Sequence, residues 1–537
     1  MKALLLHRDR DFEVERAPQR GERAQRRVTG IPSKGEETLV ADLELEVLFT
    51  AMAGKDQLVY DVARKALLTS VGNDVDTILY RQDALRDCLA NPEAILRMYA
   101  LANEVFQRQT KIWGHFREYP TGRLDYSVDV MKIYIDVFKR LRTLADQSAA
   151  KFKSEAFANL FATLKRELSD SYLTVVDGHL KQLRYRSGVP VSGALGQGLK
   201  GAGYVLRRLR QPDGWLRRIF GERRRAYKIY LAPRDEAGAQ AMNELRDRGL
   251  ALAAAALARS ADHVVSFYYQ LQTELAFYIG CLRLHERLCD LRSPSSFPFV
   301  TDRGEPRLAC KDLYDVALAL SANRRPVGND IDADGKPLIV VTGANQGGKT
   351  TFLRSVGLAQ LMMQSGMFVG AAQLGANAVD GVFTHFRREE DASMKSGKFD
   401  EELARMSDIV DMIAPHSLLL FNESFAATNE REGSEIARQI VTALLERPHK
   451  VAYVSHQYAF TRGLFESRRD STLFLRAERR DDGERTFKLI DGEPLSTSFG
   501  EDVYREVFAD EERSGHEAAL RVTIEALDTQ PRAGVQL

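Results

Sequence analysis

The chain has 537 residues, of which 44% are hydrophobic, and its 76 Lys and Arg nearly balance 75 Asp and Glu. This length predicts roughly three or four domains, and a net charge of +1 means that contact with nucleic acid or lipid has to come from a local patch. We expect no signal peptide, because the apolar part of Met1 to Glu13 is too short, and no membrane-spanning segment, because no stretch approaches ~18 apolar residues without charge. The four cysteines form no C-x-x-C pair, so we expect no disulfide framework or zinc site and favour a reducing cytoplasm.

Residues 1–37 are predicted to form an N-terminal strand followed by a mobile arm. Met1 to Val14 has a composition compatible with one or two strands. Glu15 to Glu37 is rich in Arg, Gln, Glu and Gly, which is typical of a segment that forms no packed core. A solvated tail is favoured here over an arm that binds nucleic acid.

Residues 38–292 are predicted to form an extended helical domain. Apolar side chains recur at helical spacing, as at Val59, Val62, Ala63 and Ala66, and few Gly or Pro interrupt the pattern. Helical sequence returns from Ala237 onward. A helix leading out and a helix leading back would together make an arm.

Residues 181–232 are a basic, glycine-rich insert in this domain. Lys and Arg are frequent, only Asp213 and Glu222 are acidic, and aromatic residues lie among the cations. Such a cluster is typical of a surface that binds a polyanion, while the alternative is a solvated face on an irregular insert. The candidate DNA-binding residues are Arg207, Arg208, Arg210, Arg217, Arg218, Arg223, Arg224 and Arg225.

Residues 297–510 alternate strand-like and helix-like segments, which predicts an α/β domain with a largely parallel sheet, and residues 511–537 are predicted to form a C-terminal tail. Within this domain the apolar run from Leu338 to Val341 predicts a buried strand. The sequence GANQGGKT follows at once and fits G-x-x-x-x-G-K-[ST], and a helix-compatible segment comes next.

This strand, loop and helix together predict a phosphate-binding loop. Glycines can turn backbone N–H groups toward phosphate oxygens beside a helix N-terminus. Lys349 would reach the β- and γ-phosphates, and the Thr350 hydroxyl would hold Mg²⁺. The predicted nucleotide-binding residues are Gly343, Ala344, Asn345, Gln346, Gly347, Gly348, Lys349, Thr350 and Thr351.

A second apolar strand, Ser417 to Phe421, ends in Asn422 and Glu423. In ATPases with this loop, the first of two residues at such a strand end holds the Mg²⁺ shell and the second activates water. Thr350 and Asn422 are therefore the predicted metal residues, and Glu423 and His456 the predicted catalytic residues, with His456 contacting the γ-phosphate. Because Asn422 brings no negative charge, we expect weak Mg²⁺ affinity and slow turnover.

These residues resemble the ATPase domain of the MutS DNA mismatch-repair family. The stretch TGANQGGKTTFLR is similar to the family's TGPNMGGKST-[FY]-[LM]-R, and the resemblance is strong over residues 297–470. Phe399 and Glu402 match the family's signature loop S-x-F-x-x-E, in which Gly397 occupies the serine position. Ile78 to Leu89 is similar to the start of the family's helical lever, and nothing resembles the N-terminal mismatch-reading domain.

The resemblance implies a multidomain α and α/β protein in which an extended helical lever precedes a P-loop ATPase domain of the ABC type. It also implies ATP and Mg²⁺ as cofactors, a homodimer through the ATPase domain, double-stranded DNA as partner and no membrane partner. The expected function is an ATP-driven switch or clamp in DNA repair or recombination. The alternatives are a nucleotide-gated scaffold with negligible hydrolysis, or an ATPase that acts on RNA or protein.

Overall fold

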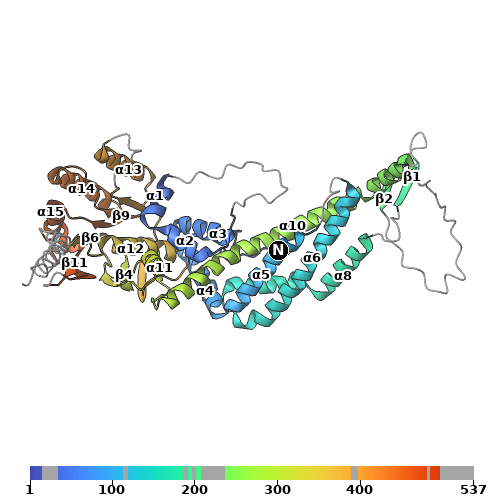
Figure 1. The fold of residues 1–537 in the computed structure, drawn as a ribbon, viewed down its shortest axis with the longest axis horizontal. Coiled ribbons are helices and arrows are strands. Elements are labelled where there is room, and N and C mark those ends of the chain that lie inside the picture. Colours follow the sequence, from blue (N-terminus) through green and yellow to red (C-terminus); the bar gives the residue numbers. More distant parts are fainter. Residues whose placement is uncertain are drawn as a thin grey trace, which may run out of the picture. The chain divides into compact units, whose positions relative to one another are not determined.

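A computed structural model of the chain describes residues 1–14, 34–112, 119–184, 191–195, 201–206, 236–388, 397–480 and 484–495. The fold divides into two compact units (Figure 1). The helical unit comprises residues 1–17, 56–63 and 83–282, and the α/β unit comprises residues 18–55, 64–82 and 283–537. Residues 38–55, 64–82 and 283–292, which the sequence predicted to belong to the helical domain, pack with the α/β unit instead.

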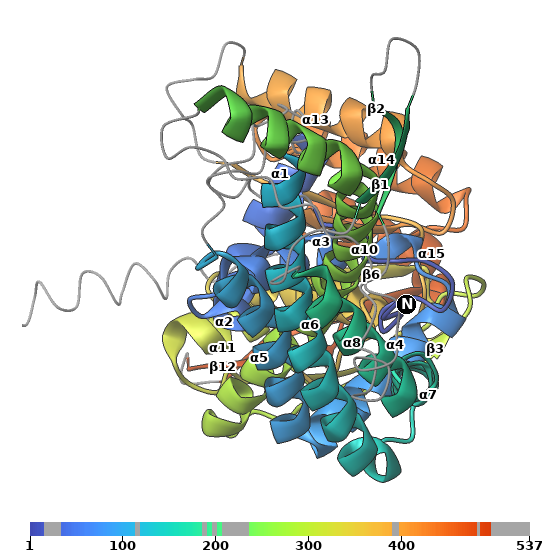
Figure 2. The ribbon, with the colours of Figure 1, turned by 90° about the vertical axis from the view of Figure 1, so that its right-hand side faces the viewer.

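The helical unit is built from long helices that lie side by side. α5 packs on α6 and α6 on α8, as both ribbon views show (Figure 1, Figure 2). Phe138 stacks on Tyr268 with ring centroids 4.7 Å apart, and the Tyr268 hydroxyl donates to the Tyr134 carbonyl at 2.9 Å. The helices are α3 (Gln57–Leu68) and α4 (Val75–Ala90), each shared with the α/β unit, α5 (Pro92–Gln109), α6 (Pro120–Ser148), η2 (Ala149–Lys151), α7 (Glu155–Glu167), α8 (Asp170–Leu183) and most of α10 (Glu236–Asp290).

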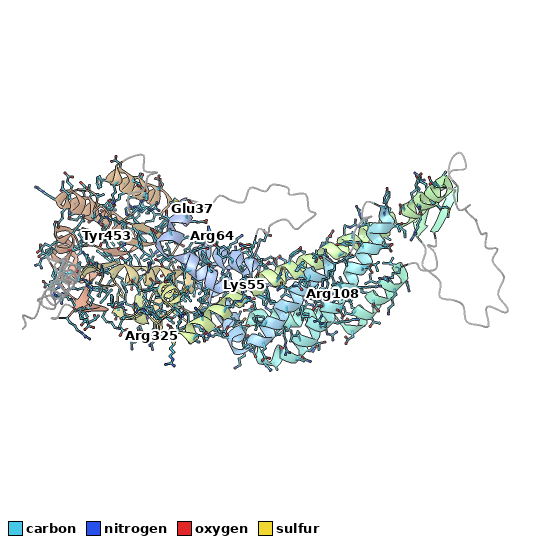
Figure 3. The ribbon with its side chains drawn as sticks, in the orientation of Figure 1. Glu37, Lys55, Arg64, Arg108, Arg325 and Tyr453 are labelled. Atoms are coloured by element: carbon cyan, nitrogen blue, oxygen red, sulfur yellow. The ribbon has the colours of Figure 1, made fainter. Side chains whose placement is uncertain are left out.

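Ion pairs lie on the surface between α5 and α6. Arg108, labelled in Figure 3, is 2.6 Å from Asp136 and 3.1 Å from Glu104, and Arg140 is 2.7 Å from the same glutamate. These side chains are partly exposed, so water and salt screen their attraction. The apolar and aromatic seam beneath them accounts for most of the packing energy of these helices.

The predicted strand in residues 1–14 is wrong, because this segment forms bends and extended backbone without a strand partner. Side chains of α10 take the place of that partner. The buried Glu274 carboxylate accepts from the backbone N–H groups of Leu5 and Leu6, and the Tyr278 hydroxyl donates to the Leu5 carbonyl at 2.6 Å. Buried backbone groups need a partner, and here helix side chains supply it.

The basic insert at 181–232 is not wholly irregular as predicted. β1 (Val191–Leu195) and β2 (Gly201–Leu206) pair in an antiparallel ribbon. Val, Leu and Tyr residues in these segments favour strand formation over the irregular structure that the glycines suggested. The eight candidate DNA-binding arginines between 207 and 225 lie outside the described residues.

Helix α10 is an exception to the expected absence of a membrane-spanning segment. A window within Met242–Asp290 has a mean hydropathy of 1.2, and by length and composition alone this helix could cross a membrane. The Ala-rich run around residues 250–258 contributes to this value. Farther along the helix, Tyr268, Leu271 and Leu275 are fully buried in the helical unit, where α10 serves as a core element.

The α/β unit contains two sheets. One has the strand order β12-β11-β6-β10-β9-β8 among the described residues and is parallel except for β12, and the other has the order β3-β7-β4-β5. The strands are β3 (Phe299–Thr301), β4 (Leu308–Leu313), β5 (Asn329–Asp332), β6 (Leu338–Gly343), β7 (Gln373–Asn377), β8 (Val382–Phe386), β9 (Leu418–Asn422), β10 (Lys450–Val454), β11 (Thr472–Arg479) and β12 (Arg485–Asp491). The predicted combination of a helical part and an α/β part with a largely parallel sheet is confirmed.

Helices cover the larger sheet and complete its core. Phe421 of β9 stacks on Tyr453 of β10, which is labelled in Figure 3, with ring centroids 5.1 Å apart, and the Tyr453 hydroxyl donates to the Ser424 carbonyl at 2.9 Å. The remaining elements of this unit are α1 (Lys34–Asp42), α2 (Leu45–Ala53), η1 (Ser70–Gly72), α11 (Val316–Ala322), α12 (Lys349–Gln364), α13 (Lys398–Met412), α14 (Glu430–Leu445), α15 (Tyr458–Arg468) and η4 (Arg469–Ser471).

Lys450 is a buried cation at the start of β10. It is 7% exposed, and its ammonium group donates to the Arg307 carbonyl at 3.4 Å and to the Gln360 amide oxygen at 3.5 Å. Burial lowers the pKa of Lys450 from 10.5 to about 7, and Asp334 opposes that shift only in part. Folding therefore releases a proton from this side chain over much of the neutral and alkaline range.

This depressed pKa predicts a specific pH dependence of stability. Between pH 7 and 10.5 the unfolded chain binds the Lys450 proton more tightly than the folded chain does, so the free energy of unfolding of the wild type rises with pH. Below pH 7 Lys450 is charged in both states, and its burial lowers the stability by the full amount. Lys450→Met has no proton to release at this position. Between pH 7 and pH 9 the free energy of unfolding of the wild type should therefore rise by about 2 kcal/mol more than that of the variant. Urea unfolding of both proteins at the two pH values measures this difference. An equal change in unfolding free energy for the two proteins would contradict a pKa lowered by burial.

Candidate nucleotide-binding site

The site lies where three parallel strands end at the same edge of the sheet. Val454 of β10 is in register with Asn422 of β9 and with Val341 of β6. The alignment continues beyond the strands, because Glu423 N–H donates to the Val454 carbonyl at 2.9 Å and Ser455 N–H donates to the Val341 carbonyl at 3.1 Å. The segments that follow the three strands are therefore brought together at this edge.

The loop between β6 and α12 depends on glycine. Gly343 has φ +105° and Gly348 has φ +87°, a left-handed region that side chains with a Cβ rarely adopt. A Cβ at Gly343 would lie 2.9 Å from the Ala477 nitrogen, and one at Gly347 would lie 2.7 Å from the Ala477 Cβ. The loop thus turns sharply while it passes directly over β11.

Lys349 is the first residue of α12 and is buried beneath this loop. It is 5% exposed, and its ammonium group donates to the carbonyls of Gly343 at 3.0 Å and Ala344 at 2.9 Å. Burial lowers the pKa of Lys349, while Glu423 raises it and Arg485 lowers it further. The loop carbonyls hold this ammonium group where a phosphate oxygen could replace them.

Thr350 and Asn422, the two predicted metal residues, are in contact. The Thr350 hydroxyl donates to the Asn422 amide oxygen at 3.1 Å. Both oxygens are neutral, whereas Mg²⁺ usually takes one or two carboxylates together with phosphate oxygens and water. No group of three or more His, Cys, Asp or Glu in the described part of the chain could hold a metal ion. The pair fits an Mg²⁺ ion that is held mainly by phosphate and water.

Glu423 lies between two cationic or polar partners. Its carboxylate is 3.6 Å from His456 Nδ1 and 3.7 Å from the Arg387 guanidinium. The nearby His456 ring lowers the pKa of Glu423, as do Lys349 and Arg387, although burial opposes the shift. Glu423 is therefore an ionised carboxylate at neutral pH, available to orient or deprotonate a water molecule. The structure brings the two predicted catalytic residues together.

One pocket of about 450 Å³ joins these groups. Its polar side contains all of the predicted residues from Asn345 to Thr351, together with Glu423. Gly343 and Ala344 contribute their carbonyls to Lys349 instead. The lining also includes the apolar residues Leu318, Ala322, Val327 and Phe487, together with Arg324 and Arg325 (Figure 3 labels Arg325). A mixture of polar and apolar lining residues is what a nucleotide would need.

The sequence did not predict three residues of this region: Phe487, Arg485 and Arg387. Phe487 belongs to β12, has φ +59° and is 48% exposed. Asn329 holds this strand in place, since its amide oxygen accepts from Leu489 N–H at 2.7 Å and its amide nitrogen donates to the Phe487 carbonyl at 3.4 Å. The pairing of β12 with β11 and these two hydrogen bonds together position this segment at the site.

The residues that match the signature loop lie at the start of α13. Gly397 caps the helix, Phe399 packs on the core of the larger sheet, and Glu402 is 2% exposed. Burial raises the pKa of Glu402, and the Glu402 carbonyl is 2.9 Å from His385 Nε2. Glu402 is therefore an interior residue and Phe399 is partly buried, while Ser396 lies outside the described residues.

Two family comparisons cover these elements. The MutS2 N-terminal domain family matches residues 73–291, and the MutS domain V family matches residues 339–511. The chain belongs to the MutS family. The match to MutS domain V includes the glycine loop, the Thr350–Asn422 pair, Glu423 and His456, and the match to the MutS2 N-terminal domain covers most of the helical unit.

Individual MutS-family relatives match shorter stretches. The DNA mismatch repair protein MutS of Chloroflexus aurantiacus is 33% identical over 156 residues, which are 27% of this chain and 16% of the relative. The proteins called Endonuclease MutS2 of Streptococcus uberis and Thermus thermophilus are 37% and 34% identical over 123 and 119 residues, each 22% of this chain and 16% of the relative. The chain thus aligns with about one sixth of the length of these curated relatives.

The close approach of the loop to β11 predicts that Gly343→Ala prevents nucleotide binding. The added Cβ would strain a positive φ and contact Ala477, which should destabilise the α/β unit by about 2 kcal/mol. Gly463→Ala in α15 is the matched control, since its Cβ would meet no atom within 4 Å and should stabilise the helix by up to about 1 kcal/mol. Urea unfolding and binding of a fluorescent ATP analogue measure both effects. Normal binding by Gly343→Ala would show that this backbone geometry is dispensable.

Proposed function

We propose that this MutS-family protein binds ATP with the loop from Gly343 to Gly348 and hydrolyses it slowly. The observation that carries the proposal is the position of the buried Lys349 ammonium group, 2.9–3.0 Å from two loop carbonyls and at the N-terminus of α12. Thr350 and Asn422 would help to hold Mg²⁺, which would polarise the phosphates. The apolar wall formed by Val327 and Phe487 would accommodate the base.

Hydrolysis would depend on Glu423. Its lowered pKa keeps the carboxylate ionised, and it lies at the edge of the pocket that contains Lys349 and Thr350. A carboxylate there can take a proton from water or hold the water in line with the γ-phosphate. His456 lies 3.6 Å from one carboxylate oxygen of Glu423 and would also reach the γ-phosphate. The neutral Asn422 supports slow rather than fast turnover.

ATP binding would drive a conformational switch or clamp on DNA, in DNA repair or recombination. Names of relatives that include DNA mismatch repair protein and endonuclease support DNA as the partner. We propose that the basic residues around Arg207 to Lys228 contact double-stranded DNA and that two ATPase domains associate, with the segment near Gly397 and Phe399 reaching the nucleotide of the second subunit. The protein would act in the cytoplasm.

A second function is favoured by one observation, the amide at position 422. If Asn422 prevents hydrolysis, the protein is a nucleotide-gated scaffold that binds ATP and turns over negligibly. An ATPase that acts on RNA or protein instead of DNA is a further alternative. Turnover separates the scaffold from the ATPase, and competition between duplex DNA and RNA separates the partners.

Two substitutions test the nucleotide site. Lys349→Ala should weaken ATP binding by about 100-fold, because it removes a charge-assisted contact to the phosphates. Glu423→Gln should leave binding within about threefold of the wild type and reduce hydrolysis about 100-fold or more. Binding titrations and steady-state phosphate release, each with and without duplex DNA, provide the readouts. If Lys349→Ala still hydrolyses ATP, the site is misassigned, and if wild type and Glu423→Gln bind ATP but are equally inert, the scaffold is correct.

The DNA proposal predicts an effect of charge removal in the insert. Changing Arg207, Arg208 and Arg210 to Gln should weaken duplex binding and reduce the slope of log affinity against log salt by about 3, since each lost phosphate contact contributes roughly 0.9. Arg438, Arg462 and Arg480 are the matched control, because they are exposed and paired with glutamates of the α/β unit. Fluorescence anisotropy across a salt series gives both quantities. Equal slopes for the two triple variants would remove the insert from the DNA interface.

A further inference from the structure

Arg485 of β12 is a cation next to the glycine loop whose hydrogen-bonding capacity is only partly used. One of its terminal nitrogens donates to the Gln346 side-chain oxygen at 3.0 Å. Its Nε and Nη2 atoms are buried and have no hydrogen-bond partner among the residues that the structure describes. A buried guanidinium with unused donors is costly unless an anion occupies them.

Arg387 places a second guanidinium near the Glu423 carboxylate. It follows β8, where its backbone N–H donates to the Asn422 carbonyl at 3.0 Å, and its guanidinium is 3.7 Å from the Glu423 carboxylate. The side chain is 41% exposed, so it can reorient without breaking a buried contact. Its position is fixed at the base by the pairing of β8 with β9.

The charges in this region suit a polyphosphate without a metal ion. Lys349, Arg387 and Arg485 are cationic, whereas the Thr350–Asn422 pair supplies only neutral oxygens toward a metal. An aspartate at position 422 would strengthen metal binding and repel free polyphosphate. The Asn422 amide does neither. Cationic side chains of the protein would therefore neutralise phosphate charge that Mg²⁺ would otherwise neutralise.

We propose that this site binds ATP with similar affinity in the presence and absence of a divalent cation, because Arg485 and Arg387 neutralise charge that Mg²⁺ would otherwise neutralise. The inference rests on the proposed function and concerns binding only. Arg485 would turn its buried donors toward phosphate oxygens beside Gln346, which lines the pocket, and Arg387 would turn from Glu423 toward the terminal phosphate.

The test is a titration of the full chain with a fluorescent ATP analogue in excess Mg²⁺ and again in EDTA. For the wild type we expect dissociation constants within about threefold of each other. Asn422→Asp should weaken binding in EDTA about tenfold by repulsion and leave binding in Mg²⁺ unchanged or tighter, which creates a dependence on the metal. Wild-type binding that occurs only in Mg²⁺ would overturn the inference and leave the proposed function intact.

Arginine variants show whether the charge is supplied by these side chains. Arg485→Gln should weaken binding in EDTA about tenfold and binding in Mg²⁺ much less, and Arg485→Lys should recover part of the loss. Arg387→Gln is an exposed substitution that should act in the same direction, and Arg438→Gln is the matched surface control. Equal losses in both media, or none, would overturn the inference. Absence of nucleotide binding by the wild type in both media would remove the proposed function as well.

Discussion

The site depends on one constraint, the parallel register of β6, β10 and β9. Because parallel strands end at a common edge, residues more than 70 positions apart in the chain meet there, as Thr350 and Asn422 do at 3.1 Å. The two hydrogen bonds that extend the register past the strands, to Glu423 and Ser455, then fix where Glu423 and the segment of His456 begin. A slip of one residue would turn each of these side chains to the other face of the sheet.

Electrostatics at this edge combines a buried cation with a carboxylate that must stay charged. Lys349 would be costly to bury alone, and the carbonyls of Gly343 and Ala344 offset part of that cost. Glu423 in turn stays ionised because His456, Lys349 and Arg387 surround it. Cationic groups outnumber the single carboxylate that they surround. A site for a strongly anionic ligand is expected to have this excess of positive charge.

The parts of the site that could be predicted from the sequence are those with a motif directly after a strand. The glycine loop, Asn422, Glu423 and His456 satisfy that condition, and sheet order then brings them together. Arg387 and Arg485 could not be predicted, since they follow or begin strands without a motif, and β12 reaches the loop only by folding back on β11. Residues 1–14 were assigned wrongly for a related reason, because a side chain from α10, the buried Glu274, replaces the neighbouring strand that an extended segment normally needs.

The α/β unit is assembled from segments that are far apart in the chain, and this affects how it can form during synthesis. Asn73 donates to the Gln364 carbonyl at 2.9 Å, and Gly366 lies against Arg81, so residues 64–82 supply buried partners to α12. These residues leave the ribosome roughly 200 positions before residue 283, where the rest of the unit begins. At 5–20 residues per second that interval is roughly 10–40 s. Throughout it residues 64–82 lack the partners that they contact at Gln364 and Gly366, so this buried face stays open until α12 is made.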